Sequence, residues 1–392
     1  MPFFPIAKGV TVTATPTVWI SAVETSADMH GARVMRSLQA RYPGLRFRGV
    51  GGPAMRRAGL DAVARAEDLS VMGLTEVLEF LPRILKILRR VKRELAATAP
   101  VAVVCIDAPD FHFPVAKRAA RLKLPVVYYV APQAWAWRKN RVTFLRRYVD
   151  RLMCLLPFEE SFFRDYGVNA RFAGHPLLED MAEHNAAPGH PESAVLAILP
   201  GSRHKEIHSL LPPFLDTVRR LHHAHPDLSC RLIQAPGIAA ETLLEHWPES
   251  VPVELVTAEA RWAALSTATV ALAASGTATL ECALLGLPTV VAYKVSQVSY
   301  AIGKRLVDVP YISLPNLIMD KPLFPEFLQD DVCADQLSQA LEQWLVSPED
   351  RMQTRSELQG LRHRLGGRTA SEEVAEAVLE VAGLATPGTR HP

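Results

Sequence analysis

In the segment VAVVCIDAPDF at 101–111, a strongly apolar run is followed by two acidic residues, which could act as a base or as a helix cap. The apolar residues are mostly β-branched, a pattern typical of a parallel strand buried on both faces. Asp107 and Asp110 stand at its carboxyl end, the edge at which open α/β sheets collect ligands. Asp110 fits the cap of a helix expected over 112–122, which leaves Asp107 as the candidate general base.

Two segments in the second half of the chain are suited to a bound diphosphate. LPGSR at 199–203 and SGTATLE at 275–281 each join a strand end to a helix start through a glycine. Free backbone N–H groups at a helix start bind anions, and an arginine adds positive charge. Glu281 lies four residues after Thr277, on the same helix face, where a carboxylate can accept both hydroxyls of a ribose. Together the segments predict a nucleoside-diphosphate site formed by Arg203, Ser275, Gly276, Thr277 and Glu281.

The loop VETSADMHG at 23–31 follows the first expected strand and lacks the GxGxxG of a dinucleotide site. Ser26 or Asp28 would cap the helix that follows. Glu24 is expected at the same sheet edge as Asp107, either as a solvated loop acid or as a substrate contact.

Two other motifs allow more than one interpretation. The loop QAWAWRKNR at 133–141 sets two tryptophans beside three cations, which could hold a phosphate, line a lipid-facing rim or cover the cleft. His204 and His208 have the spacing of a zinc helix, but the intervening glutamate is one position late and no third ligand is evident. We therefore expect no metal site.

Strand-like runs alternate with helical segments in both halves, which predicts parallel sheets with right-handed crossovers. The expected strands are 18–23, 45–50, 101–106, 125–130, 151–156, 195–199, 230–234, 253–256, 269–274 and 288–293. Ten strands suit two sheets, and the polar segment AEHNAAPGHPES at 182–193 marks the boundary between them. The predicted architecture is α/β, with two Rossmann-like domains facing each other across a cleft.

The segment at 71–95 combines an apolar stripe at helical spacing with a strongly basic opposite face. Pro82 is expected to start a second helix or to kink the first. The topology requires a crossover helix here, and periodicity alone favours that interpretation. A basic amphipathic helix on an anionic membrane surface is the alternative.

The composition limits the class of protein. The chain has 392 residues, 49% of them hydrophobic, and 43 Lys+Arg against 41 Asp+Glu give a net charge of +2. The length and the hydrophobic content favour two globular domains. The nearly balanced charge argues against a nucleic-acid binder. Five scattered cysteines without a CxxC pair predict buried thiols in a reducing compartment. Without a signal peptide or a membrane-spanning apolar stretch, the chain is expected to be cytoplasmic.

Ten segments between positions 24 and 317 resemble, in order and spacing, the lipid-A-disaccharide synthase family. They are ETSADMHGA (24–32), VGGPAM (50–55), VMGLTEVL (71–78), IDAPDF (106–111), APQAWAWRKNRV (131–142), LPFE (156–159), GHP (174–176), LPGSR (199–203), ASGTATLE (274–281) and SLPNL (313–317). IDAPDF, the tryptophan loop and LPGSR are specific, whereas SGTATLE is shared with other sugar-nucleotide enzymes.

The resemblance implies a GT-B fold and an inverting, metal-independent glycosyltransferase without a cofactor. Such an enzyme transfers diacylglucosamine from UDP-diacylglucosamine to lipid X and releases UDP. It works as a peripheral protein on the cytoplasmic face of the inner membrane, and a homodimer is one expected state. Because both substrates carry acyl chains, the resemblance favours membrane contact by Leu78, Leu81, Ile84, Leu85 and Leu88.

The resemblance also assigns roles to residues and domains. Asp107 is implied as the general base, Arg203 and 275–277 as the diphosphate site, and Glu281 as the ribose contact, with Asn316 and Glu24 completing the cleft. The implied domains are an acceptor- and membrane-facing domain at 1–180, joined by a C-terminal helix within 366–392, and a UDP-sugar domain at 181–365.

The chain departs from the family at Val23 and Ala27, where family members have glycine. Since β-branched residues avoid positive φ, either this loop has an ordinary conformation or the substrate approaches differently. A different GT-B enzyme, such as an epimerase or a peptidoglycan glycosyltransferase, is one alternative, but it leaves IDAPDF and AWAWRKNR unexplained. A non-catalytic UDP-sugar- or lipid-binding descendant is the other, and Val23 is its only support.

Overall fold

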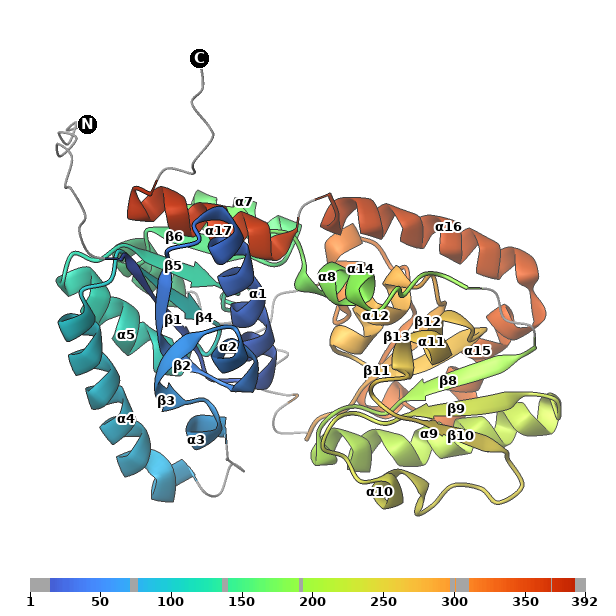
Figure 1. The fold of residues 1–392 in the computed structure, drawn as a ribbon. Coiled ribbons are helices and arrows are strands. Elements are labelled where there is room, and N and C mark those ends of the chain that lie inside the picture. Colours follow the sequence, from blue (N-terminus) through green and yellow to red (C-terminus); the bar gives the residue numbers. More distant parts are fainter. Residues whose placement is uncertain are drawn as a thin grey trace. The chain divides into compact units, whose positions relative to one another are not determined.

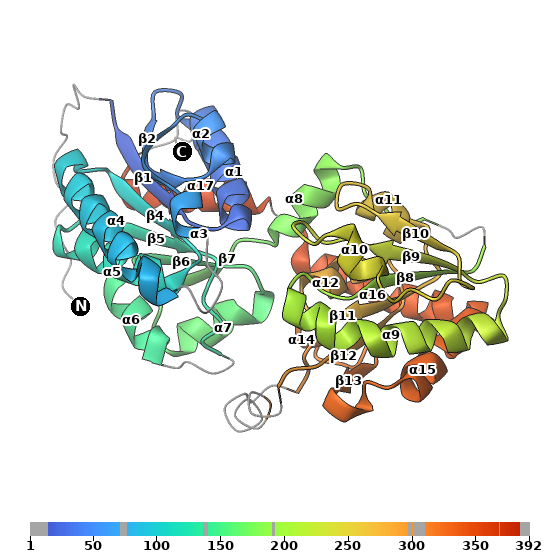
Figure 2. The same cartoon turned by 90° about the horizontal axis from the view of Figure 1, so that it is seen from below.

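The computed structural model describes residues 15–70, 77–135, 140–189, 193–296, 300, 310–367 and 369–384. The chain divides into two compact units, Met1–Pro176 with Arg368–Pro392, and Leu177–Gly367. Each unit is a parallel β-sheet with helices on both faces, as Figures 1 and 2 show. The predicted α/β class with two Rossmann-like halves is therefore confirmed.

The first unit contains a seven-stranded sheet in the order β3-β2-β1-β4-β5-β6-β7. Its strands are β1 (Thr17–Ala22), β2 (Arg46–Gly51), β3 (Leu60–Arg65), β4 (Ala102–Ile106), β5 (Val126–Tyr129), β6 (Arg151–Cys154) and β7 (Ala170–Phe172). The strand order reverses between β1 and β4, where Ala22 pairs with Ile106. The loops that carry Glu24 and Asp107 therefore leave the sheet from neighbouring strand ends, at the position where such sheets bind ligands.

Helices cover both faces of this sheet. They are α1 (Thr25–Arg41), α2 (Pro53–Arg57), α3 (Glu67–Ser70), α4 (Val77–Thr98), α5 (Pro109–Arg121), α6 (Asn140–Tyr148), α7 (Pro157–Asp165) and α17 (Ala370–Ala382). Buried residues of α1 and α17 form one apolar layer with the sheet, and those of α4 and α5 belong to the other. The C-terminal helix α17 packs against α1 and is held by ion pairs from Arg171 to Glu373 (2.5 Å) and from Arg151 to Glu380 (3.3 Å).

The second unit contains a six-stranded sheet in the order β10-β9-β8-β11-β12-β13. Its strands are β8 (Val195–Leu199), β9 (Ser229–Ile233), β10 (Val253–Val256), β11 (Val270–Ala274), β12 (Thr289–Tyr293) and β13 (Glu326–Leu328). Its helices include α9 (His204–Ala224), α10 (Ala240–Leu244), α11 (Arg261–Ser266), α12 (Thr277–Leu284), α14 (Leu314–Met319), α15 (Ala334–Val346) and α16 (Pro348–Leu365), and α8 (Pro176–Glu183) lies at the boundary of the units. The order reverses between β8 and β11, which brings LPGSR beside SGTATLE.

All ten expected strands are present, with ends shifted by at most two residues, and three strands were not expected. The missed strands β3, β7 and β13 each form the edge of a sheet. Their residues are only partly buried, so they lack the continuous apolar pattern of the central strands. Of the five cysteines, four are buried and Cys333 is half-buried.

Two of the expected helix caps are wrong. Helix α5 begins at Pro109 with Ala108 as its N-cap, so Asp110 lies inside the first turn, exposed and 3.2 Å from Arg141. Helix α1 begins at Thr25 with Glu24 as its N-cap and has no side-chain cap. Both helices begin within three residues of the preceding strand, so the starts expected from the capping preferences of Ser, Asp and Asn lie too late in the sequence.

Asp28 caps a different helix. Its carboxylate accepts hydrogen bonds from the backbone N–H groups of Gly52 (2.7 Å), Ala54 (2.8 Å) and Met55 (3.1 Å) at the start of α2. A Cβ atom at position 52 would lie 2.5 Å from Asp28 Oδ2, so the glycine is required for this approach. Two of the family-like motifs, ETSADMHGA and VGGPAM, are thus the two sides of one capping interaction.

Val23 and Ala27 have ordinary backbone conformations. Neither belongs to the residues with positive φ, and Glu24 between them is extended, with φ −119° and ψ 156°. Val23 is 7% exposed and packs in the apolar layer beneath α4 and α5, while Ala27 packs on the opposite layer. The loop therefore needs no glycine at either position.

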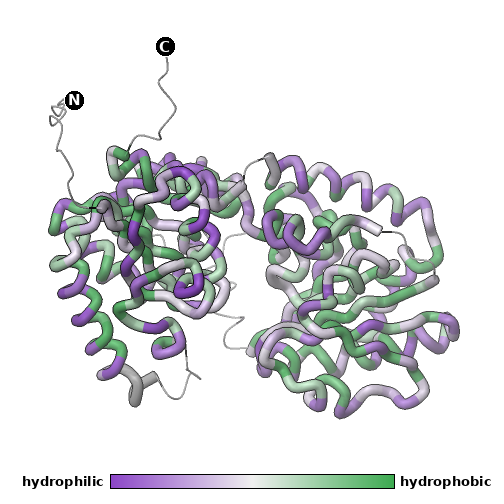
Figure 3. Tube along the Cα trace, viewed as in Figure 1, coloured by the Kyte–Doolittle hydropathy of each residue, from purple (hydrophilic) through white to green (hydrophobic). Residues whose placement is uncertain are grey.

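Helix α4 continues through Pro82 without ending, so the expected second helix start at Pro82 is wrong. Val91 and Leu95 are fully buried under the sheet, as a crossover helix requires, whereas Leu85 is 40% exposed. Apolar and polar residues alternate along α4 in Figure 3. Positions 71–76 and the side chains of Leu78 and Leu81 lie outside the described residues. None of the described helices has an apolar stretch long enough to span a bilayer.

Candidate active site

Asp107 ends the buried strand β4 in an unusual backbone conformation. Asp107 and Ala108 have φ angles of 55° and 42°, so two consecutive residues with side chains are left-handed. Each left-handed L-residue costs about 1–2 kcal/mol, and such strain persists only where surrounding contacts hold it. Burial raises the pKa of the Asp107 carboxyl, while a hydrogen bond from the Ala108 N–H lowers it. A carboxylate with a raised pKa is a stronger base than an exposed one.

The main chain of Asp107 is held by residues that the sequence did not indicate. Its N–H donates to the carbonyl oxygen of Tyr129 (2.9 Å). Its carbonyl oxygen accepts from Tyr128 Oη (2.6 Å) and lies 2.8 Å from His112 Nδ1. The other ring nitrogen of His112 is 2.9 Å from Ser21 Oγ on the neighbouring strand β1. No motif separates these contacts from ordinary core residues.

The predicted nucleotide residues line a cavity of about 290 Å³ in the second unit. The ends of β8 and β11 and the starts of α9 and α12 form it, and α11 contributes one wall. Four of the five predicted residues line it, namely Ser275, Gly276, Thr277 and Glu281. No atom lies within 4 Å of a Cβ built on Gly276, so this turn leaves open space at the helix start.

Glu281 is paired with Arg261, which the sequence analysis missed. Arg261 Nε lies 3.1 Å from Glu281 Oε2, and its Nη1 donates to the Ala258 carbonyl oxygen (2.7 Å). The guanidinium also lies over the ring of Trp262, 4.4 Å from its centroid. Burial raises the pKa of Glu281, and Arg261 acts in the opposite direction. Arg261 is therefore a fixed cation in the wall of the cavity.

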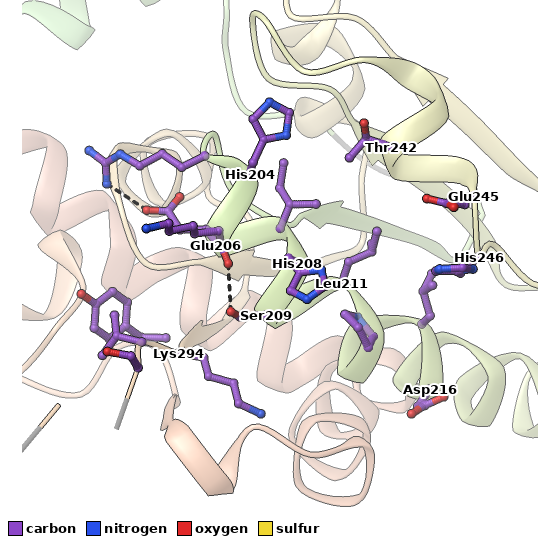
Figure 4. A pocket seen from close by; sticks show the side chains of 18 of the residues that line it. His204, Glu206, His208, Ser209, Leu211, Asp216, Thr242, Glu245, His246 and Lys294 are labelled. Carbon is purple, nitrogen blue, oxygen red and sulfur yellow. Dashed lines mark hydrogen bonds and ion pairs between the residues drawn. The ribbon is translucent and has the colours of Figure 1, made fainter. Parts of the chain in front are cut away.

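Arg203 lies outside this cavity. It is the N-cap of α9, its side chain is 80% exposed, and its Nη1 is 2.9 Å from Glu206 Oε1. Arg203 lines a larger hollow of about 1130 Å³ along α9, which shares Glu206 with the smaller cavity. Figure 4 shows this hollow, with His204 and His208 on one side of α9 and Lys294 on the other. Within the described part of the chain, no group of three or more His, Cys, Asp or Glu side chains is arranged to hold a metal.

Asn316 is buried and lines neither cavity. Its Nδ2 donates to the Phe324 carbonyl oxygen and to Glu326 Oε1 (both 2.8 Å), and its Oδ1 accepts from Phe324 N–H (2.9 Å). Glu326 also accepts from the N–H groups of Ile312 and Ser313 (both 2.9 Å). The Ile312 carbonyl oxygen in turn accepts from Ser275 Oγ (2.8 Å). In this structure Asn316 thus supports the turn at 275–277 through Glu326 and does not line the cavity.

Glu24 is exposed at the end of β1, beside the strand that delivers Asp107. As an exposed carboxylate at the sheet's reversal point, it is accessible to a ligand there.

The tryptophan loop is anchored by a buried carboxylate. Trp135 Nε1 donates to Glu159 Oε1 (3.0 Å), and the ring meets Phe158 edge-on at 5.1 Å. Glu159 Oε2 accepts from the N–H groups of Leu155 (3.2 Å) and Leu156 (3.1 Å). Trp135 therefore has a packing role. Its hydrogen bond to Glu159 connects the loop at 133–141 with the segment LPFE at 156–159. Positions 136–139, with the second tryptophan, lie outside the described residues.

The chain is similar to known proteins over nearly its whole length. Residues 18–381 match the family model described as lipid-A-disaccharide synthetase. A lipid-A-disaccharide synthase of Anaeromyxobacter dehalogenans (strain 2CP-C) is 41% identical over 379 residues, covering 94% of this chain and 98% of that protein. The lipid-A-disaccharide synthase of Alcanivorax borkumensis is 39% identical over 376 residues, with 93% and 97% coverage.

Two solved structures of other enzymes share the fold. The calicheamicin glycosyltransferase CalG4 has a TM-score of 0.59 at 16% identity, covering 95% of this chain and all of that one. A UDP-N-acetylglucosamine 2-epimerase has a TM-score of 0.63 at 11% identity, with 95% and 98% coverage. At such low identity these likenesses show the GT-B architecture alone.

The first prediction concerns the buried Glu159. Burial raises the pKa of Glu159 from 4.5 to about 7, against the opposing effect of its hydrogen-bond donors. Between these values the native state holds a proton that the unfolded chain has released, so the free energy of unfolding falls as pH rises. Glu159→Gln should flatten this slope. An amide has one acceptor oxygen where the carboxyl has two, so its NH₂ has to face either the Trp135 N–H or the two backbone N–H groups, which should cost about 2–3 kcal/mol at pH 5.

Urea unfolding at pH 5, 6 and 7 measures both effects. The exposed Glu245→Gln serves as the control and should unfold like the wild type at each pH. An equal pH slope in wild type and Glu159→Gln would show that Glu159 is ionised throughout this range.

Proposed function

Since the chain belongs to the lipid-A-disaccharide synthetase family, and is thereby a glycosyltransferase of lipid A biosynthesis, we propose that its reaction is inverting and metal-independent. It transfers diacylglucosamine from UDP-diacylglucosamine to the primary hydroxyl of lipid X. The observation that carries this proposal is Asp107, a partly buried carboxylate at the reversal point of the first sheet. The cavity beside Ser275–Thr277 in the second unit supports it as the place for UDP.

In the proposed mechanism Asp107 removes the proton of the acceptor hydroxyl. The hydroxyl oxygen forms a bond to the anomeric carbon, the bond from that carbon to the diphosphate oxygen breaks, and its electron pair leaves with UDP. A carboxylate is a weak base for an alcohol, so the proton moves late, once the breaking anomeric bond has made the hydroxyl more acidic. The raised pKa of Asp107 reduces the mismatch with the hydroxyl.

The proposed nucleotide site combines helix-start N–H groups with two cations. The backbone at 275–277 and Arg203 bind the diphosphate and stabilise the departing UDP. Glu281 accepts the ribose hydroxyls, and Arg261 keeps it ionised and in place. Asn316 contributes through Glu326 and Ser275, and Glu24 completes the site on the acceptor side.

The proposed division of labour follows the two units. The domain at 1–180, with the helix within 366–392, holds the acceptor and contacts the membrane, and the domain at 181–365 holds the UDP-sugar. Leu78, Leu81, Ile84, Leu85 and Leu88 of α4 contact the cytoplasmic face of the inner membrane. The exposure of Leu85 beside the exposed cations Arg83, Lys86 and Arg89 supports this contact. A homodimer is part of the proposal, with no cofactor and no nucleic acid.

Replacing Asp107 by asparagine tests the proposed base. Asp107→Asn removes the proton acceptor at nearly constant shape, so kcat should fall by about 10²–10⁴-fold while UDP binding is unchanged. UDP release from UDP-diacylglucosamine and lipid X, with EDTA present, measures turnover. Asp110→Asn is the matched control, because Asp110 is 91% exposed only three positions away, and it should keep wild-type activity. Full activity of Asp107→Asn would remove Asp107 from the mechanism and leave the family assignment intact.

Replacing Arg261 tests the ribose site. In Arg261→Met the buried Glu281 loses its counter-charge and its pKa rises further, so UDP should bind about tenfold more weakly, most of all at low pH. Calorimetric titration with UDP measures this. Arg231→Met is the control, because Arg231 makes the same kind of contacts outside the cavity, from Nε to Glu254 (3.0 Å) and from Nη1 to the Ala264 carbonyl oxygen (2.8 Å). Equal UDP affinity of both variants would contradict the proposed role of Arg261.

Replacing apolar residues of α4 tests the membrane surface. Leu81→Gln with Leu85→Gln should weaken binding to vesicles containing phosphatidylglycerol about tenfold, since both side chains are proposed to enter the lipid. Co-sedimentation with the vesicles measures binding. Val346→Gln, which changes a 61% exposed apolar residue of the second unit, should bind like the wild type. Wild-type binding by the α4 variant would place the membrane contact elsewhere.

A further inference from the structure

Two buried side chains, His112 and Tyr128, contact the carbonyl oxygen of Asp107, and a third, Ser21, contacts His112. Ser21, His112 and Tyr128 are each 0% exposed and come from β1, α5 and β5. A carbonyl oxygen only accepts hydrogen bonds, so both Tyr128 Oη and His112 Nδ1 must donate to it. His112 Nε2 then carries the lone pair and accepts from the Ser21 hydroxyl. Burial lowers the pKa of His112 to about 4, so the ring is neutral at physiological pH.

These donors account for the left-handed turn at the proposed base. With the φ angles of an ordinary helix or strand at Asp107 and Ala108, the carbonyl would turn away from both donors. The Tyr128 hydroxyl and the His112 N–H would then be buried without an acceptor, which proteins avoid. The two donors therefore select the conformation that the backbone alone disfavours.

The orientation of the carbonyl also fixes the next N–H group. In a trans peptide the C=O and N–H bonds point in opposite directions, so the Ala108 N–H points away from His112 and Tyr128. The interaction of this N–H with the Asp107 carboxylate lowers the pKa of that carboxyl. We propose that His112 and Tyr128, with Ser21 behind His112, are positioning residues of the transferase reaction, because they hold the left-handed peptide between Asp107 and Ala108 and thereby the position of the Asp107 carboxylate. This inference rests on the proposed role of Asp107 as the base.

The surroundings of Asp107 allow its titration to be identified. Among the described residues, the titratable groups on the neighbouring elements include Glu24 after β1, Cys105 on β4, Tyr128 on β5, Asp110 and His112 on α5, and Arg141 on α6. Burial raises the pKa of Cys105 to about 12 and that of Tyr128 well above 10, so both are neutral at physiological pH. Asp110 is paired with Arg141, and the Asp110→Asn control removes its contribution. The fall of activity at low pH is assigned to Asp107 if it persists in this control and is absent from the residual activity of Asp107→Asn.

The test is the pH dependence of kcat/KM for His112→Leu and Tyr128→Phe. We expect kcat to fall about 10–100-fold with the KM for UDP-diacylglucosamine unchanged, because the base is misplaced while the nucleotide site is intact. Loss of the N–H donor destabilises the ionised carboxylate, which raises its pKa, so the acid limb should move to higher pH. His112→Asn, whose amide nitrogen takes the position of Nδ1, should restore most of the activity and the wild-type limb. Tyr129→Phe removes a hydroxyl from the adjacent residue of β5, whose side chain lies on the opposite face, and should resemble the wild type.

Two results would overturn the inference. Wild-type kcat and an unmoved limb in Tyr128→Phe would show that the carbonyl needs no anchor. Reduced kcat with an unmoved limb would show a purely structural role. If His112→Leu fails to fold, as judged by circular dichroism and a lost or lowered thermal transition, Tyr128→Phe decides, because it keeps the buried ring. The outcome is separate from that of Asp107→Asn: an inactive Asp107→Asn beside unaltered anchor variants would refute this inference alone, whereas an active Asp107→Asn would refute the proposed base.

Discussion

Every candidate site in this protein depends on the reversal of strand order in a parallel sheet. Between β1 and β4, and again between β8 and β11, the chain connections leave in opposite directions, so no crossover covers the strand ends. Asp107 and the turn at 275–277 lie at these two positions. The strands that lead to them are fully buried, so the sheet fixes where each loop begins. Reactive groups on short loops thereby acquire the rigidity of the core.

Carboxylates beneath the loops provide a second common feature. The buried Asp28 and Glu159 and the half-buried Glu326 each accept backbone N–H groups of a turn, and each joins two segments that are distant in sequence. A buried carboxylate is costly unless its oxygens are satisfied, so these residues tolerate few changes in the surrounding backbone. Many residues of the family-like motifs, such as Asp28 and Glu159, therefore maintain the conformation of loops. Only a few motif residues, Asp107 and Glu281 among them, are available for chemistry.

The two candidate half-sites differ in electrostatics, in keeping with their proposed tasks. Burial raises the pKa of Asp107, no cation of the described residues opposes this rise, and a base benefits from it. Glu281 is also buried, but Arg261 opposes the rise of its pKa, as suits a carboxylate that has to stay ionised to accept hydrogen bonds. Burial thus raises the pKa of both carboxylates, and only Glu281 has a described cation beside it that opposes the rise.

The sequence alone determined the central strands, the two-domain α/β class and the positions of Asp107 and the turn at 275–277. Continuous apolar runs and glycine-bearing strand ends are local signals, and they survive any tertiary arrangement. The tertiary structure decided the edge strands β3, β7 and β13, whose partly buried residues carry no such signal. It also decided the partners: Arg261 is 20 residues from Glu281, and Ser21 is 91 residues from His112. Periodicity tells which side of an element is buried, but only strand order and packing bring two such side chains within hydrogen-bond distance.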